Sequence, residues 1–271
     1  MTLADPGPGW LFCPADRPER FAKAAAAADV VILDLEDGVA AHDREAARSA
    51  LVDTPLDPTR TVVRVNPAGT DDHVLDLAAV ARTHYGTVML AKTEHASHVY
   101  ALAPLQVVVL IETPLGAINL VEIARCDNVF GTMWGAEDLF AATGGTANRW
   151  PDGTYRDVAL HVRSQSLLAA KALGRLAIDS VYLDIKNLDG LRAEADDAVA
   201  VGFDAKVAIH PSQVAVVHAA YAPTGEQVLW AQGILDAASG ERGVFQFDGT
   251  MVDAPVLRRA ERIVRLAAVH A

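Results

Sequence analysis

Cysteine is scarce in this sequence, and the signals that would send the chain to or through a membrane are missing. Cys13 and Cys126 are far apart and form no CxxC pair, which gives no basis for a disulfide framework and fits a reducing compartment. The N-terminal MTLADPGPGW lacks the basic and apolar regions of a signal peptide. The longest apolar stretch, ALAPLQVVVLIE, is too short to span a bilayer. We therefore predict a cytoplasmic protein.

Basic charge is also in short supply. The 23 Lys and Arg residues face 35 Asp and Glu residues, for a net charge of −12, which argues against a nucleic-acid or membrane-surface partner. An anionic ligand held by a few local cations is still compatible with this balance. GxGxxG, Walker A, GxSxG and HExxH motifs are absent. About half of the 271 residues are apolar, so the chain can bury a large core and is not disordered.

Short apolar runs alternate with longer helical segments along the chain. Eight runs are expected to be buried strands: WLFC near residue 10, VVILDLED from Val30, TVVRVN from Thr61, TVMLAK from Thr87, VVVLIE from Val107, VFGTMWG from Val129, SVYLDI from Ser180 and AKVAIH from Ala205. Eight strand–helix repeats predict a parallel sheet closed into a (β/α)8 TIM barrel. An open doubly wound sheet is the alternative, and the missing GxGxxG turn favours the barrel.

The pattern changes after the eighth run. Two helical segments follow Pro211, and then comes FQFDGTMVDAPVLRRAERIVRLAAVHA, a turn-rich piece with a terminal amphipathic helix. We expect a catalytic barrel over residues 1–240 and a C-terminal lid and helix over 241–271. This extension is longer than a barrel requires, so it either packs on its own barrel or reaches a neighbouring subunit.

Polar residues gather where the expected strands end. In a TIM barrel these ends build the active site, and charged groups there are costly to bury without partners. The residues concerned are Asp34, Glu36, Asp37, Arg64, Asn66, Lys92, Glu112, Glu137, Asp138, Asp184 and His210. They indicate a shared polar cavity, with purely structural ion pairs as the alternative.

Glu112 and Asp138 follow consecutive strands of this pattern. Carboxylates on neighbouring strands can converge on one hard cation, and Mg²⁺ typically takes one or two protein carboxylates and fills its other positions with water and substrate. Arg64 can hold a carboxylate or polarise a carbonyl with its planar guanidinium. The spacing equally allows Arg64 or Lys92 simply to neutralise the two acids.

The segment CPADRPERFAK follows the first strand and opens the first helix. Cations and free backbone N–H groups at a helix N-terminus suit phosphates, so Arg17, Arg20 and Lys23 could cradle a phosphorylated ligand. On its own the segment is better explained as a solvated helix face in which Asp16 and Glu19 are the partners of these cations.

Seven motifs in order resemble the citrate lyase beta-subunit-like family, the HpcH/HpaI aldolase/citrate lyase group that includes malyl-CoA, citramalyl-CoA and related 3-hydroxyacyl-CoA lyases. They are GWLFCPADRPERF, VVILDLEDGV, VVRVN, VLIETPLGAINL, MWGAEDL, AIHPSQ and FDGTMVDAPVLRRA. The resemblance spans nearly the whole chain and is strongest to the short, stand-alone form of mycobacterial type. No single motif is specific, but the ordered set is.

The resemblance implies roles for individual residues. The family's arginine falls on Arg64, its magnesium carboxylates on Glu112 and Asp138, and its lid aspartate on Asp253. In relatives that lid comes from an adjacent subunit of a trimer or hexamer. The CoA-contacting positions match Phe12, Arg17 and Lys23. Glu36 and Asp37 are expected to orient Arg64, Lys92 or metal-bound water, and Glu137 and His210 are further candidates for substrate or CoA binding.

The implied function is a magnesium-dependent carbon–carbon lyase that converts a 3-hydroxyacyl-CoA thioester to a short acyl-CoA and an oxo acid, or runs the reverse reaction. The chain carries no fused acyl-carrier domain, so a free CoA thioester is the expected substrate. Two alternatives stay open: a thioesterase acting on the same substrates, and a non-catalytic acyl-CoA-binding or complex subunit.

Overall fold

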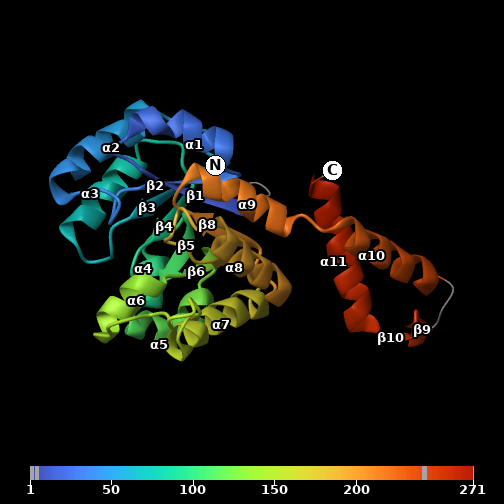
Figure 1. Cartoon of the computed structure of the whole chain (residues 1–271). Coiled ribbons are helices and arrows are strands. Elements are labelled where there is room, and N and C mark those ends of the chain that lie inside the picture. Colours follow the sequence, from blue (N-terminus) through green and yellow to red (C-terminus); the bar gives the residue numbers. More distant parts are fainter. Residues whose placement is uncertain (1–2, 4–5, 240–242, 271) are drawn as a thin grey trace. The chain divides into compact units, whose positions relative to one another are not determined.

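Eight parallel strands close into a barrel in the computed structural model, which describes residues 3, 6–239 and 243–270. Each strand pairs with its sequence neighbours, and β1 also pairs with β8 (Figure 1). The strands are β1 (Gly9–Pro14), β2 (Val30–Asp34), β3 (Thr61–Val65), β4 (Thr87–Leu90), β5 (Gln106–Ile111), β6 (Val129–Trp134), β7 (Leu176–Asp179) and β8 (Ala205–Ala208). The predicted TIM barrel is confirmed.

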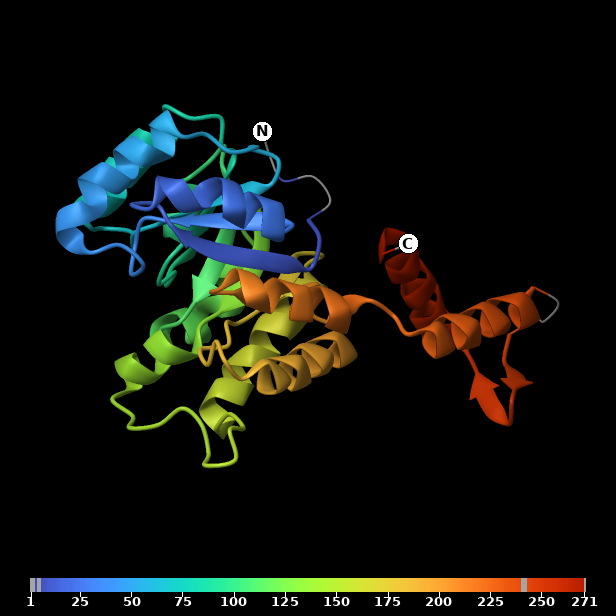
Figure 2. The same ribbon diagram turned by 45° about the horizontal axis from the view of Figure 1, so that its top comes forward.

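Helices connect the strands and lie outside the barrel (Figure 2). They are η1 (Pro18–Arg20), α1 (Phe21–Ala27), η2 (Ala41–Asp43), α2 (Arg44–Asp53), α3 (Asp71–Val80), α4 (Ala96–Tyr100), α5 (Pro114–Ala124), α6 (Ala136–Thr143), α7 (Asp157–Ala172), α8 (Leu188–Val201) and α9 (Pro211–Tyr221). Within the described residues, no helix has the length and apolar character needed to cross a membrane.

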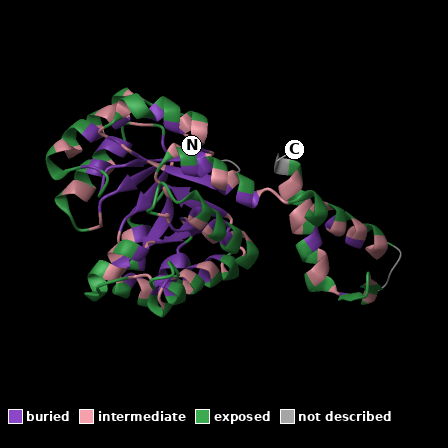
Figure 3. Cartoon of the chain, viewed as in Figure 1, coloured by how far each residue is buried: buried purple, intermediate pink, exposed green. Residues whose placement is uncertain are grey.

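The barrel strands are buried on both sides, as their continuous apolar runs predicted (Figure 3). Successive strand residues point to opposite faces, so Trp10 and Ile32 pack inside the barrel with Met89 and Met133. The intervening residues, such as Leu33, pack outward among the helices. Two apolar layers therefore fix every strand, and polar strand-end residues stay at the mouth.

Local capping sets where several helices begin. The Thr113 side chain accepts the N–H of Gly116 at the start of α5, where Pro114 occupies the first turn. The Asn187 side chain likewise accepts the N–H of Gly190 at the start of α8. Such caps satisfy backbone donors that the helix itself leaves free. They place the first helical turns next to the strand ends.

The seventh predicted strand is wrong in position. We expected SVYLDI from Ser180, whereas β7 is the preceding run Leu176–Asp179. The chain leaves the sheet after Asp179, and Leu183 is 51% exposed. Asp184, expected at a strand end, is an exposed loop residue that accepts the N–H of Lys186. It is therefore not the strand-end charge that we expected.

The chain divides into two compact units, Met1–Val217 and His218–Ala271. The second unit contains α10 (Gly225–Ala238), the hairpin of β9 (Phe245–Phe247) and β10 (Thr250–Val252), and α11 (Ala254–His270). Its small core contains Ala231, Ile234, Val252 and Ala260. The division comes earlier than the expected boundary at 240 because α10 packs on α11 and β9.

Candidate active site

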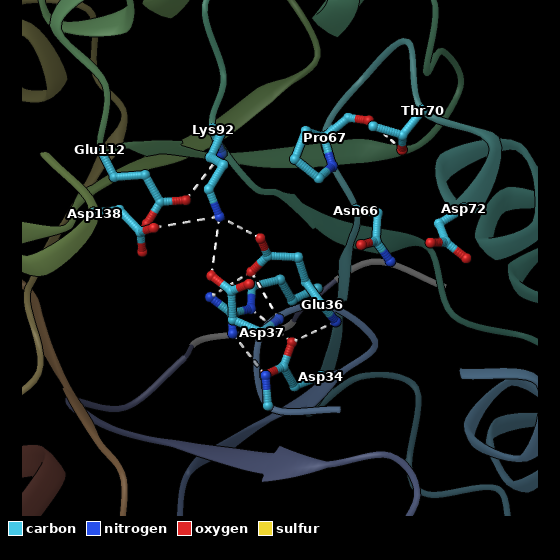
Figure 4. Close-up of polar contacts among 12 residues, drawn as sticks. Asp34, Glu36, Asp37, Asn66, Pro67, Thr70, Asp72, Lys92, Glu112 and Asp138 are labelled. Carbon is cyan, nitrogen blue, oxygen red and sulfur yellow. Dashed lines mark hydrogen bonds and ion pairs between the residues drawn. The ribbon is translucent and has the colours of Figure 1, made fainter. Parts of the chain in front are cut away.

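Charged side chains from four strand ends and the first turn of a helix meet at the C-terminal mouth of the barrel (Figure 4). Asp34 ends β2, Arg64 lies on β3, Lys92 follows β4 and Glu112 follows β5. Asp138 lies in the first turn of α6, directly after β6. Carboxyl ends of parallel barrel strands share one face, which explains how residues about 100 positions apart in the chain come together.

Arg64 is held by a buried, two-point ion pair. Its Nε and Nη2 atoms each donate to a carboxylate oxygen of Asp34 at 2.6 Å, and its Nη1 lies 3.2 Å from Glu36. Burial alone would lower the pKa of Arg64, but the charge and hydrogen bonds of Asp34, together with the charges of Glu36 and Glu112, outweigh burial and raise that pKa. The guanidinium also lies 4.6 Å from the ring centroid of Phe12. Arg64 is thus a fixed, permanently charged group.

The loop after β2 wraps around the Asp34 carboxylate. The backbone N–H groups of Glu36 and Gly38 donate to its two oxygens, each at 2.9 Å. A Cβ atom at position 38 would lie 2.2 Å from Asp34 Oδ2, so this close approach requires glycine. The loop therefore fixes Asp34, and through it Arg64.

Lys92 lies among four acidic side chains. Its Nζ contacts Glu36, lies 2.9 Å from Asp37 and lies 3.4 Å from Asp138. Its backbone N–H donates to Glu112 Oε1 at 2.9 Å. The residue has a backbone φ of +47°, in the left-handed region that residues other than glycine rarely adopt. This conformation lets one residue bind acids with both its main chain and its side chain.

Glu112 is a buried acid of the cluster with a strongly raised pKa. It is only 3% exposed, and burial together with the charge of Asp138 raises its pKa to about 8, although Arg64 opposes the shift. A Cβ atom on Gly135 would lie 2.8 Å from Glu112 Oε2, so the backbone between β6 and α6 lies close against this carboxylate. Asp138 is half-buried beside it.

The donor set fits a magnesium ion. Glu112 and Asp138 offer hard oxygen atoms, and their mutual repulsion, which raises the pKa of Glu112, would be relieved by a divalent cation. Across the described part of the chain, no group of three or more His, Cys, Asp and Glu side chains is placed to hold a metal. Two carboxylates suffice for Mg²⁺ when water and substrate complete its shell.

A cavity of about 450 Å³ lies beside the ion cluster. Phe12, Lys23 and His210 line it, together with Arg20. Because Phe12 also contacts Arg64, the cavity adjoins the charged mouth. Arg17 is exposed and pairs with Asp16 at 3.2 Å, and it does not line this cavity. The structure therefore brings together Phe12 and Lys23, two of the three predicted CoA-contacting residues, and places His210, one of the two further candidates, in the same cavity.

Two other predicted site residues have contacts within their own units. Glu137 is an exposed residue of α6 whose Oε1 accepts a hydrogen bond from Asn148 at 2.5 Å. Asp253 belongs to the second unit, where its Oδ1 accepts the N–H of Val256 at the start of α11. It lines a cavity of about 470 Å³ with Phe245 and other residues of the same unit.

The sequence alone gave less detail for two residues that the geometry brings forward. Asp34 was expected only as a strand-end charge. Lys92 was expected as a side chain that neutralises Glu112 and Asp138 or is oriented by Glu36 and Asp37, and no role was expected for its main chain. The strand register could have identified Asp34, since it lies directly opposite Arg64 in the β2–β3 pairing. The main-chain role of Lys92 has no sequence signal, because its positive φ follows from the loop's path.

Two protein-family models match the chain. Residues 9–211 match the HpcH/HpaI aldolase/citrate lyase family, and residues 157–271 match a C-C bond lyase of the TIM-barrel fold. A citrate lyase subunit beta-like protein of Mycobacterium tuberculosis (strain ATCC 25618 / H37Rv) is 61% identical over 267 residues, 98% of each chain. A mitochondrial citramalyl-CoA lyase of Rattus norvegicus is 31% identical over 88% of this chain and 79% of its own.

Solved structures agree with this relationship. CitE from Mycobacterium tuberculosis in complex with magnesium, acetoacetate and coenzyme A has a TM-score of 0.95 and 61% identity, over 97% of this chain and 99% of its own. A citrate lyase beta subunit of M. tuberculosis complexed with oxaloacetate and magnesium has a TM-score of 0.80 and 64% identity, over 81% and 98%. The chain therefore belongs to the HpcH/HpaI aldolase/citrate lyase family.

Proposed function

We propose that the chain is a cytoplasmic, magnesium-dependent carbon–carbon lyase. It cleaves a 3-hydroxyacyl-CoA thioester to a short acyl-CoA and an oxo acid, or forms the thioester from these two compounds. The observation that carries the proposal is the pair Glu112 and Asp138 beside the permanently charged Arg64. Relatives whose complexes hold magnesium together with acetoacetate and coenzyme A, or with oxaloacetate, support it.

The reaction places negative charge where Arg64 can meet it. Cleavage of a 3-hydroxyacyl thioester turns the hydroxyl oxygen into a carbonyl oxygen and leaves a thioester enolate. Arg64 would stabilise negative charge on the reacting oxygen, since a preorganised cation costs little reorganisation during the reaction. Asp34, Glu36 and Phe12 hold its guanidinium in place.

Glu112 and Asp138 would hold the magnesium ion. When bound, Mg²⁺ supplies Lewis-acid polarisation of the substrate oxygen and orients the substrate. Glu36 and Asp37 accept the Lys92 ammonium, which fits the orienting role expected for them. We predict that Glu112→Ala and Asp138→Ala each abolish Mg²⁺ binding in a calorimetric titration. Retained affinity in both variants would contradict the assignment.

The cavity beside Phe12 would take part of the CoA moiety. Lys23 and His210 line it, and Lys23 supplies a cation for a phosphate group. Arg17, exposed at the start of the same segment, would contact CoA from outside the cavity. Glu137 remains a proposed substrate contact through its place in the first turn of α6.

Asp253 would complete the site from a neighbouring copy in a trimer or hexamer and handle a proton at the enolate carbon. Two inactive variants test this arrangement. If Arg64→Ala and Asp253→Ala proteins are unfolded and refolded together, mixed oligomers regain activity in those sites that combine an intact barrel with an intact lid. No recovery in verified mixed oligomers would contradict a shared site.

A product assay decides the reaction type. The purified protein is incubated with malyl-, citramalyl- and 3-hydroxy-3-methylglutaryl-CoA, with Mg²⁺ or with EDTA, and products are identified by mass spectrometry. A short acyl-CoA plus an oxo acid, lost in EDTA, is the expected result. Free CoA with an intact hydroxy acid would identify a thioesterase instead. No turnover of any substrate would favour a non-catalytic subunit.

A further inference from the structure

The Lys92 ammonium lies where three carboxylates meet. It contacts Glu36, lies 2.9 Å from Asp37 and lies 3.4 Å from Asp138 (Figure 4). The Glu112 side chain contacts the same residue at its main chain, where Oε1 accepts the N–H of Lys92 at 2.9 Å. The mouth of the barrel therefore contains four acidic side chains within reach of one residue, twice as many as the proposed magnesium site uses.

With Lys92 in place, no three acids of the described residues are positioned to hold a metal. The same four carboxylates without the Lys92 ammonium would make a different kind of metal site, even though Arg64 still pairs with Glu36. Ca²⁺ takes six to eight oxygen ligands and accepts irregular geometry, whereas Mg²⁺ works with one or two carboxylates and keeps its other positions for water and substrate. A site that recruited Glu36 and Asp37 in addition to Glu112 and Asp138 would bind cations tightly and leave fewer positions for an oxo acid.

We propose that Lys92 is a specificity-determining residue for the metal. By pairing with Glu36 and Asp37, it keeps both acids out of the metal's coordination shell, so that Glu112 and Asp138 alone hold the cation and the oxo acid can bind to it. The inference rests on the proposed function, because it assigns these two carboxylates to Mg²⁺.

The backbone at Lys92 supports this role. Its φ of +47° is unusual for a residue with a side chain, and it allows the N–H to hold Glu112 while the side chain turns to Glu36 and Asp37. Lys92 thereby holds Glu112 through its main chain and Glu36 and Asp37 through its ammonium, which also lies 3.4 Å from Asp138. Arg64 reinforces the hold on Glu36, since its Nη1 lies 3.2 Å from Glu36.

The test compares cation binding in variants by isothermal titration calorimetry. Lys92→Met removes the ammonium but keeps the main-chain N–H that Glu112 accepts. We expect this variant to bind Mg²⁺ about tenfold more tightly than the wild type does. Its gain in affinity for Ca²⁺ should be larger than its gain for Mg²⁺. Its affinity for oxaloacetate in the metal-saturated state should fall about tenfold, because fewer metal positions remain for this ligand.

Two matched variants control for other effects. Lys92→Arg keeps the charge and should keep the wild-type cation affinity. Lys171→Met removes a lysine that pairs with Asp204 at 2.5 Å, away from the site, and should also bind cations as the wild type does. In the Lys92→Met background, Asp37→Asn should reverse most of the gain, since it removes one released ligand.

An unchanged or weaker cation affinity in folded Lys92→Met overturns the inference. If that variant does not fold, the single variant Asp37→Asn decides, because the Asp37 side chain is 54% exposed and a residue outside the coordination shell should change Mg²⁺ affinity less than about threefold. A loss as large as that of Asp138→Asn overturns the inference too. The wild type could turn over its thioester while Lys92→Met shows no gain in cation affinity. That outcome refutes this inference and leaves the proposed function intact.

Discussion

Replacing Glu112 by glutamine should make the magnesium-free protein more stable. Glu112 is 3% exposed, and burial with the charge of Asp138 raises its pKa from the ordinary 4.5 to about 8. The folded state thus holds a neutral carboxyl group at pH values where the unfolded chain ionises it. Glutamine has nearly the same shape, keeps an oxygen for the Lys92 N–H and has no charge to desolvate.

The sign and size of the effect follow from linkage. A raised folded-state pKa gives stability that is present below pH 4.5 and is lost progressively up to about pH 8. Each pH unit between 4.5 and 8 lowers the free energy of unfolding by about 1.4 kcal/mol. Through Glu112 the wild-type protein therefore loses about 3 kcal/mol of stability at pH 7 and about 5 kcal/mol above pH 8. The advantage of Glu112→Gln should grow along the same curve.

Urea unfolding in EDTA, followed by circular dichroism between pH 5 and pH 9, measures this difference. Glu122→Gln, an exposed position on α5, is the control and should change the free energy of unfolding by less than about 0.5 kcal/mol. Added Mg²⁺ should stabilise the wild type and leave Glu112→Gln unchanged, because only the carboxylate binds the cation. A Glu112→Gln protein that is less stable than wild type, or whose advantage does not vary with pH, would refute the reasoning.

The other predictions concern the ion pair and the two thiols. Asp34→Asn should lower the free energy of unfolding by about 3 kcal/mol, since it replaces the charged two-point partner of the buried Arg64 by a neutral amide and leaves only Glu36 as a charged partner at 3.2 Å. Asp196→Asn, which breaks an exposed helical ion pair, should lower the free energy of unfolding by less than about 0.5 kcal/mol. If urea unfolding showed equal losses for Asp34→Asn and Asp196→Asn, it would contradict this prediction. Cys13, whose pKa burial raises to about 11, and Cys126 are buried, so Ellman's reagent should label neither thiol before denaturation, and rapid native labelling would be the opposing result.

The number and order of the elements could be predicted from the sequence because their signals are local. Continuous apolar runs mark strands covered on both faces, and seven of the eight expected runs coincide with strands. The seventh failed because SVYLDI and the preceding LAID are both apolar, and only packing decides which of two adjacent runs enters the sheet. LAID pairs with β6 and β8, while Leu183 is left exposed.

The candidate site was predictable in its membership and less so in its contacts. Charges at strand ends identified Arg64, Glu112 and Asp138, because a charge that ends an apolar run needs a partner or a function. The arrangement of partners depends on register and loop path. Asp34 faces Arg64 through the β2–β3 pairing, and Lys92 reaches Glu36 and Asp37 across the mouth.

The sequence by itself determined the barrel, the acidic character and the family, since hydrophobic periodicity, composition and ordered motifs are properties of the chain alone. The tertiary structure decided which charges neutralise one another and which acid is desolvated. It assigned Asp34 to Arg64, placed Glu112 in an environment that raises its pKa to about 8, and set Lys92 among four acids. These outcomes depend on distance and burial, which arise only when strands distant in sequence close into one barrel.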